Sequence, residues 1–178
     1  LSLKAAVRES NCELIRFAVL VHDLGKALTA EDELPHHYTH DRDGIEPLQA
    51  LRRRLKLPLK WYKAGKLAIT EHMRAFKWQE MRPGKVVRLF EKAHNSPIGV
   101  EGLAAIIKCD RRGRGNLNLQ VPEVNGMVKL AEKMFQETDA SCIKGISHGP
   151  ELGEAIFQYR CQWLKQERKK YKDTHPDG

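Results

Sequence analysis

The sequence has few cysteines and no long hydrophobic segment, and both absences narrow the class of protein. Its four cysteines are Cys12, Cys109, Cys142 and Cys161. They include no Cys-x-x-Cys pair and form no dense framework, so we expect reduced, mostly buried thiols of a cytoplasmic protein. No apolar run exceeds five residues, as in 17–21, which excludes a helix that spans a bilayer.

The composition is that of a folded, basic protein. Its 178 residues suit one domain of ordinary size, or one domain with a short appendage. Charged residues make up 30% and hydrophobic residues 41%, which excludes a disordered chain and a membrane-embedded one. The chain lacks an initiator Met and a signal peptide, and a helical pattern starts almost at once. We therefore expect it to be a fragment of a longer protein.

Proline and glycine divide the sequence into segments of helical length, and no stretch alternates in the manner of a β-strand. We predict an all-α fold with a main bundle over 1–115 and a smaller helical tail over 116–178. A basic, glycine-containing stretch at 111–116 separates the two. Gly25 follows the first apolar run, at a point where helices often end on a left-handed residue.

Three ionisable residues fall where predicted helices should face the core. Each follows an apolar stripe with the spacing i, i+3, i+4 and occupies the position one turn later: His22, His72 and Asp110. A charged group at such a position is costly unless it is paired or bound to a metal. We expect the three helices to point these side chains toward one end of the bundle, with Asp23 beside His22. Imidazole and carboxylate ligands suit Zn, Ni, Co, Mn or Fe.

Simpler explanations exist for each residue taken alone. A single histidine on an apolar face is more often a satisfied core residue than a ligand. Asp41 and Asp43 spell Asp-x-Asp, but they open a predicted helix, where acids are expected. Cys109 is best explained as a packing residue. The coincidence of three helices, together with the residues around His22, favours a metal site.

Residues 17–26 read Phe-Ala-Val-Leu-Val-His-Asp-Leu-Gly-Lys, an apolar helix that ends in His-Asp. With His40, Glu71-His72 and Asp110 downstream, this pattern resembles the HD superfamily of metal-dependent phosphohydrolases. More narrowly, nearly the whole chain resembles the C-terminal region of the bacterial CCA-adding enzymes, which are tRNA nucleotidyltransferases. The similar segments are Leu-Pro-His-His-Tyr-Thr-His at 34–40, Thr-Glu-His at 70–72 and Cys-Asp-Arg-Arg-Gly-Arg at 109–114.

The resemblance implies an HD-type helical bundle with 2′,3′-cyclic phosphodiesterase, 2′-nucleotidase and phosphatase activity. It implies attachment to a nucleotidyltransferase that matures and repairs the 3′ end of tRNA. His22, Asp23 and Asp110 would bind a divalent metal ion (Ni, Co, Mn or Mg). His40 and His72 would lie on the phosphate side, as ligands of a second metal or as proton donors.

Two parts of the family pattern are missing from this sequence. The HD pattern begins with a further histidine upstream of His-Asp, and no histidine precedes His22. We expect that ligand to lie outside this chain. The nucleotidyltransferase head is also missing, since no Gly-Ser followed by a strand and Asp-x-Asp is found.

The residue types fit phosphoester hydrolysis independently of the resemblance. A divalent metal lowers the pKa of a bound water toward about 7 and offsets charge on a phosphoryl oxygen. Lys26 is placed to hold another oxygen, although a solvated lysine at a helix end explains it equally well. His40 or His72 could protonate the leaving oxygen, because an unperturbed imidazole has a pKa of about 6.5.

Positive charge predicts a polyanionic partner. Lys and Arg number 31 against 23 Asp and Glu, a net charge of +8, and the excess gathers at 52–60, 111–114 and 165–172. We expect salt-dependent binding of tRNA, although solvated helix faces alone explain the last cluster well. Arg111, Arg112 and Arg114 directly follow Asp110, so their guanidinium groups can reach a phosphate held on the metal.

Three functions are compatible with these features. The leading hypothesis is a metal-dependent phosphohydrolase that acts on RNA 3′ ends or nucleotides. The second is the tRNA-binding body of the nucleotidyltransferase, with a non-functional HD site. The third is a free-standing HD nucleotidase whose tail forms a homodimer. The complete set of candidate residues argues against the second. The third is disfavoured because the resemblance to the CCA-adding enzymes covers nearly the whole chain, including the tail over 116–178. The native metal, the preferred phosphoester and a possible homodimer are left open by the sequence.

Overall fold

The computed structural model describes residues 1–145 and 148–174, with side chains up to residue 170. Every regular element in these ranges is helical and none is a strand, which confirms the predicted all-α fold. The longer helices are α1 (Ser2–Glu9), α2 (Glu13–Val21), α4 (Ile45–Leu55), α5 (Leu59–Phe76), α6 (Pro83–His94), α7 (Gly99–Gly113), α8 (Pro122–Glu137) and α9 (Pro150–Thr174). The short elements are α3 (His40–Asp43) and the 3₁₀ turns η1 (Leu24–Leu28), η2 (Glu31–Glu33), η3 (Trp78–Glu80) and η4 (Ala140–Cys142). None of these helices combines the length and apolar character that a membrane span requires.

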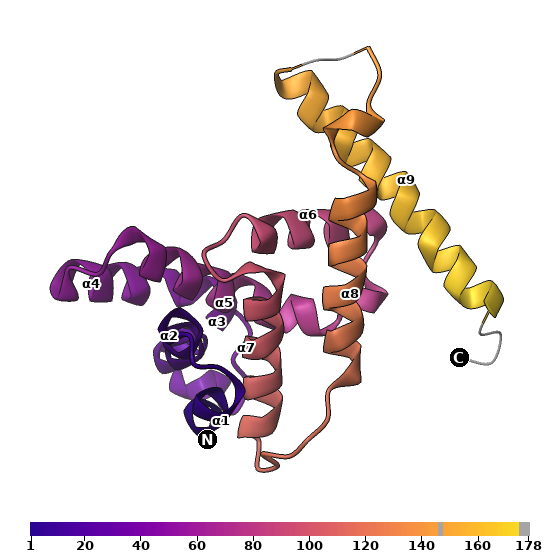
Figure 1. Cartoon of the computed structure of the whole chain (residues 1–178). Helices are drawn as coiled ribbons and strands as arrows, with labels where there is room; N and C mark the ends of the chain where they lie inside the picture. The colour runs from indigo at the N-terminus through magenta and orange to yellow at the C-terminus, as the bar shows by residue number, and fades with distance from the viewer. Residues whose placement is uncertain (146–147, 175–178) are drawn as a thin grey trace.

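The core forms where α2, α5 and α7 pack together, with α1 against α7. Figure 1 shows α7 between the α1–α2 pair on one side and α8 on the other. Each helix buries the apolar stripe that its 3.6-residue periodicity predicts. Small side chains at the contacts allow the helices to approach closely, and all of the following are buried: Ala5, Ala6, Ala18, Ala64 and Ala68.

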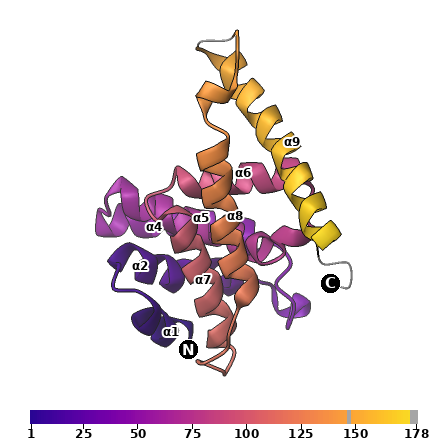
Figure 2. The same ribbon diagram turned by 45° about the vertical axis from the view of Figure 1, so that its right-hand side comes forward.

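The C-terminal helices pack on the same hydrophobic core. Val124 and Met134 of α8 and Leu164 of α9 belong to one buried cluster with the residues of α5, α6 and α7. Figure 2 shows α8 and α9 as neighbouring helices at the end of the chain, and α9 lies mainly against α6. An ion pair of 2.8 Å joins Arg160 to Glu91 across that contact. The helical tail is therefore present as predicted, while the boundary at residue 116 stays a prediction.

Gly25 differs from its predicted role. It follows α2 within η1, but its φ is not positive, so the expected left-handed helix end is wrong. The physical reason for glycine is a close approach of two backbone segments. A Cβ at Gly25 would lie 2.1 Å from the carbonyl oxygen of His40 and 2.7 Å from its Cα. His40 itself opens the short helix α3.

Candidate metal centre

Four helices bring five polar side chains together at one end of the bundle. His22 caps the C-terminus of α2 and Asp23 follows it, while His40 opens α3. His72 lies near the end of α5, and Asp110 lies in the last turn of α7. The imidazoles are buried, with exposed fractions of 5% for His22, 8% for His40 and 3% for His72. All five positions were candidate site residues in the sequence.

The three imidazole rings are each oriented by a main-chain carbonyl of their own segment. Nδ1 donates a hydrogen bond to an oxygen three or four residues earlier in His22, His40 and His72. The acceptors are Val19, His37 and Ala68, at 2.7, 2.6 and 2.8 Å respectively. Because a carbonyl oxygen only accepts, Nδ1 carries the proton and Nε2 presents its lone pair in the neutral ring. This is the tautomer of histidine ligands whose second nitrogen is fixed by a hydrogen bond.

The free Nε2 atoms converge on the carboxylate of Asp23. Nε2 of His40 and Nε2 of His72 each lie 3.7 Å from Oδ1 of Asp23. Nε2 of His22 lies 3.3 Å from Oδ2 of Asp23 and 3.6 Å from Oδ1 of Asp110. The His22 and His72 ring centroids are 5.0 Å apart, so both rings border the same small volume.

The polar atoms of this cluster fit a divalent cation. Nε2 of His22, Nε2 of His40 and Oδ1 of Asp23 are buried and have no hydrogen-bond partner. Unpartnered buried acceptors are costly, so a missing partner that accepts lone pairs is indicated. Ligand atoms of His22, Asp23 and His72 all lie within 4.8 Å of one another. Donors on one ion are up to about 4 Å apart when each bond is about 2.1 Å, so a small contraction closes the site.

The ionisation of the cluster reflects concentrated negative charge. Burial lowers the pKa of His22, but the carboxylates of Asp110 and Asp23 outweigh burial and raise it to about 9. Burial raises the pKa of Asp23, but His22 and Lys26 together hold it well below its usual range. Burial and the charge of His22 lower the pKa of His72. The carboxylates that stabilise the proton on His22 would also stabilise a metal cation bound at the same position.

Each carboxylate of the cluster also pairs with a more exposed cation. Nζ of Lys26 lies 2.6 Å from Oδ2 of Asp23, and the lysine side chain is 36% exposed. Nη2 of Arg114 lies 2.9 Å from Oδ2 of Asp110, and the arginine side chain is 56% exposed. With burial opposing, His22 and Arg114 lower the pKa of Asp110. The predicted phosphate-binding residues Lys26 and Arg114 thus lie beside the cluster.

The other two arginines of the predicted phosphate-binding set have different partners. The guanidinium of Arg111 lies 4.5 Å from the centroid of the Phe76 ring. Arg112 forms an ion pair with Glu9, and its Nε donates to the carbonyl oxygen of Leu119 at 3.0 Å. The three arginines therefore do not converge on one point, and their binding of RNA stays a prediction.

Sequence reasoning missed the role of Glu71, which precedes His72 and is only 2% exposed. Its carboxylate forms ion pairs with Lys92 and, at 3.2 Å, with Arg74. Arg74 lies three residues later on the same helix, and this spacing in the sequence could have indicated the Glu71–Arg74 pair. Lys92 comes from α6, and nothing in the linear sequence indicates that contact. This ion pair between the buried Glu71 and the exposed Lys92 joins α6 to the helix that carries His72.

Comparison with known proteins finds a family model and several relatives that are similar to this chain. The family model of the HD domain matches residues 1–116. A multifunctional CCA protein from Acinetobacter baylyi is 34% identical over 177 residues, which is 98% of this chain and 43% of that protein. One from Acinetobacter baumannii is 30% identical over 98% of this chain and 42% of its own length. One from Mannheimia succiniciproducens is 40% identical over 121 residues, 64% of this chain and 29% of that protein.

These similarities confirm the resemblance inferred from the motifs. The chain spans less than half the length of the relatives that it matches. No solved structure matches it. Since the family model covers residues 1–116 of 178 and includes every side chain of the His/Asp cluster, this chain belongs to the HD domain family.

Proposed function

We propose that this chain is the metal-dependent phosphohydrolase part of a tRNA CCA-adding nucleotidyltransferase. Its substrates would be 2′,3′-cyclic phosphodiesters, 2′-nucleotides and simple phosphate esters. The activity would contribute to the maturation and repair of the tRNA 3′ end. One observation carries the proposal: three buried imidazoles, each fixed by a main-chain carbonyl, present Nε2 to Asp23. The relatives named multifunctional CCA proteins support tRNA as the partner.

His22, Asp23 and Asp110 are the proposed metal ligands, with His72 as a fourth. Nitrogen and oxygen donors together suit Ni, Co, Mn or Mg in different degrees, with nitrogen favouring the transition metals. A divalent cation held there supplies Lewis-acid chemistry: it acidifies a water and offsets charge on a phosphoryl oxygen. The lowered pKa of His72 keeps its ring neutral, as a ligand must be, which favours the ligand role over that of proton donor.

The remaining groups have roles toward the phosphoester. Lys26 is held by Asp23 at 2.6 Å and is partly exposed, so its ammonium is positioned to orient a phosphate oxygen. His40 is the better candidate for protonating the leaving oxygen, a role that requires the doubly protonated ring, with a proton on Nε2 as well as on Nδ1. Its Nδ1 is fixed on the His37 carbonyl, and its Nε2 faces Asp23 without a hydrogen bond.

A second candidate function, the tRNA-binding body with a non-functional HD site, is favoured by one observation. Lys26 and Arg114 already neutralise the two carboxylates from within the chain, which reduces the need for an external cation. The two functions differ in metal content and in hydrolysis, and both can be measured on the same protein.

The test measures metal content and hydrolysis of 2′,3′-cyclic AMP in the full chain and three variants. We expect about one transition-metal ion per chain, since one set of converging ligands binds one ion. Asp23→Asn and His72→Ala should lose both the ion and the activity. His94→Ala is the matched control, because His94 stacks on Phe135 outside the cluster and should retain both.

Two outcomes would contradict the proposal. Metal-loaded protein that hydrolyses no cyclic or linear phosphoester would favour the tRNA-binding body. An equal content of bound metal in Asp23→Asn, His72→Ala and His94→Ala, at about one ion per chain, would place the ion elsewhere. Repeating the assay on a chain extended upstream to include a first histidine tests whether that residue completes the site.

A further inference from the structure

A hairpin of two helices carries most of the net positive charge of the chain. Between Pro47 and Thr70, along α4 and α5, the sequence has seven cations and no acid. The cations are Arg52, Arg53, Arg54, Lys56, Lys60, Lys63 and Lys66. In Figure 1 α4 extends away from the rest of the bundle, so the hairpin presents this charge on a protruding part of the molecule.

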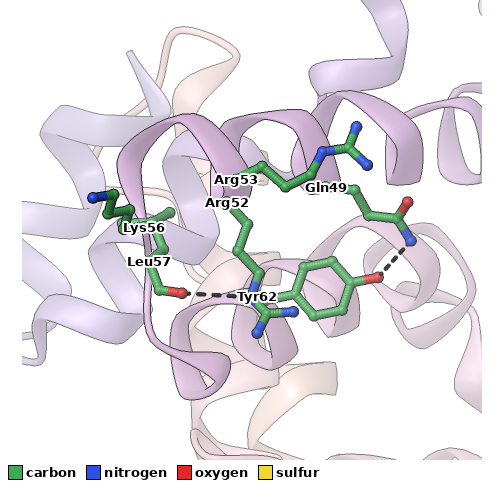
Figure 3. Close-up of a pocket in the computed structure, with 6 residues that line it drawn as sticks. All are labelled: Gln49, Arg52, Arg53, Lys56, Leu57 and Tyr62. Atoms are coloured by element: carbon green, nitrogen blue, oxygen red, sulfur yellow. Dashed lines mark hydrogen bonds between the residues drawn. The ribbon is translucent and has the colours of Figure 1, made fainter.

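A cleft of about 660 Å³ lies between the two helices near the tip of the hairpin. Figure 3 shows the side chains that line it, which are Gln49, Arg52, Arg53, Lys56, Leu57 and Tyr62. No acid contributes to this lining. Tyr62 is half-buried, whereas Arg53 and Lys56 are exposed. The cleft therefore combines an aromatic ring with cations at its edge.

Part of the lining is held in place before any ligand binds. Nε of Arg52 donates to the Leu57 carbonyl oxygen at 3.4 Å, and its guanidinium lies 5.4 Å from the Tyr62 ring centroid. Nε2 of Gln49 donates to the Tyr62 hydroxyl at 3.3 Å (Figure 3). By contrast, Arg53 and Lys56 form no ion pair within the described part of the chain. Their charges are available to an external anion.

We infer that the α4–α5 cleft binds the phosphodiester backbone of RNA, with Arg53 and Lys56 on phosphates and Tyr62 against a ribose or base. Cations with an aromatic side chain among them are the combination that binds RNA strands without reading sequence. A polyanion fits better than a small anion because the cations continue along α5 beyond the cleft, at Lys60, Lys63 and Lys66. The inference rests on the proposed function in that the substrate is RNA.

The cleft and the His/Asp cluster lie on the same helix. Tyr62 and His72 are both in α5, ten residues apart, which corresponds to about 15 Å along the helix axis. An RNA strand of a few nucleotides can bridge that separation. The hairpin would then hold the body of the RNA while its 3′ end reaches the cluster.

The test compares two adjacent arginines of one helix. Arg53→Glu and Arg54→Glu change the net charge equally, but only Arg53 lines the cleft. With a tRNA transcript as the probe, we expect Arg53→Glu and Lys56→Glu to weaken binding about tenfold. Each should also reduce the slope of log K against log salt by about one. Arg54→Glu should have a much smaller effect, and all three variants should hydrolyse 2′,3′-cyclic AMP as the wild type does.

The other outcomes distinguish a failure of this inference from a failure of the proposed function. Equal losses in Arg53→Glu and Arg54→Glu would overturn the cleft as an RNA contact, because only the general field of the hairpin would then matter. Inorganic phosphate or ATP bound as tightly as tRNA, and lost in Arg53→Glu, would make it a single-phosphate site and overturn the RNA assignment. A selective loss of tRNA binding in a protein without hydrolase activity would support the cleft while the proposed function fails.

Discussion

Replacing Gly25 by alanine tests how the His/Asp cluster is assembled. The added Cβ would lie 2.1 Å from the carbonyl oxygen of His40, well inside the 3.0 Å that real Cβ contacts respect. Both partners of this clash are backbone, so no flexible side chain can relieve it, and α3 has to move by about 1 Å. His40 is part of α3 and moves with it. The present distance of 3.7 Å between its Nε2 and Oδ1 of Asp23 therefore changes.

The expected cost follows from that displacement. Over-packed sites lose about 1–3 kcal/mol, and a backbone clash belongs at the upper end of this range. For a chain of this length, a loss of about 2–3 kcal/mol lowers the melting temperature by about 4–12 °C. Displacement of a group that supports a metal site typically weakens the metal affinity by about 10- to 100-fold. Thermal unfolding by circular dichroism and titration with Mn or Ni measure the two effects separately.

Gly153→Ala is the matched control for this experiment. Gly153 lies in α9, and a Cβ there meets no atom within 4 Å. Alanine is favoured over glycine in a helix by about 0.5–1 kcal/mol, so this variant should be slightly more stable than the wild type. If Gly25→Ala melts with the wild type and binds the same ion equally well, the close approach of Gly25 and His40 does not position the cluster.

Three further predictions concern charge. In the metal-free protein, protonation of His22 stabilises the fold fully below its ordinary pKa of 6.5, and this stability is lost as the pH rises through about 9. The free energy of unfolding, from urea midpoints, should fall by roughly 3 kcal/mol across that window, and an equal fall in His22→Gln would refute the assignment. Lys26→Ala should retain the bound metal but lose about 100-fold in kcat toward 2′,3′-cyclic AMP if the proposed contact of Lys26 with a phosphate oxygen is made mainly in the transition state. An unchanged kcat would leave Lys26 as a solvated partner of Asp23. Arg111→Glu and Arg114→Glu should each lower the salt slope of tRNA binding by about one. Arg112→Glu should also lower the melting temperature, because Arg112 pairs with Glu9; tRNA affinity unchanged at low salt in all three would place the RNA surface elsewhere.

The parts of the fold that follow from periodicity could be predicted from the sequence. The apolar stripes before His22, His72 and Asp110 correctly indicated that these side chains meet. Each stripe faces the core, so the residue one turn beyond it lies on the same inward face of its helix. The meeting of His40 with the cluster required the family pattern. Its position depends on α3, a helix of four residues that carries no periodic signal.

Contacts between segments far apart in the sequence could not be predicted. Gly25 was assigned to a helix end because glycine is common there, whereas the actual reason is the backbone of His40, fifteen positions later. The arginines after Asp110 were treated as one group, yet Arg112 is held by Glu9, more than a hundred residues earlier. Such pairings depend on how the helices pack, and neither charge nor spacing in a single sequence determines them.

The orientation of the three histidine rings also couples cation binding to the release of a proton. With each Nδ1 bonded to a main-chain carbonyl, Nε2 is the atom of each ring that is left to bind a cation. The pKa of His22 is raised to about 9, so near neutral pH this ring is protonated in the metal-free protein. A cation bound to Nε2 of His22 at the proposed site has to displace that proton. Uptake of the cation should therefore release about one proton, and cation affinity should rise as the pH rises toward about 9.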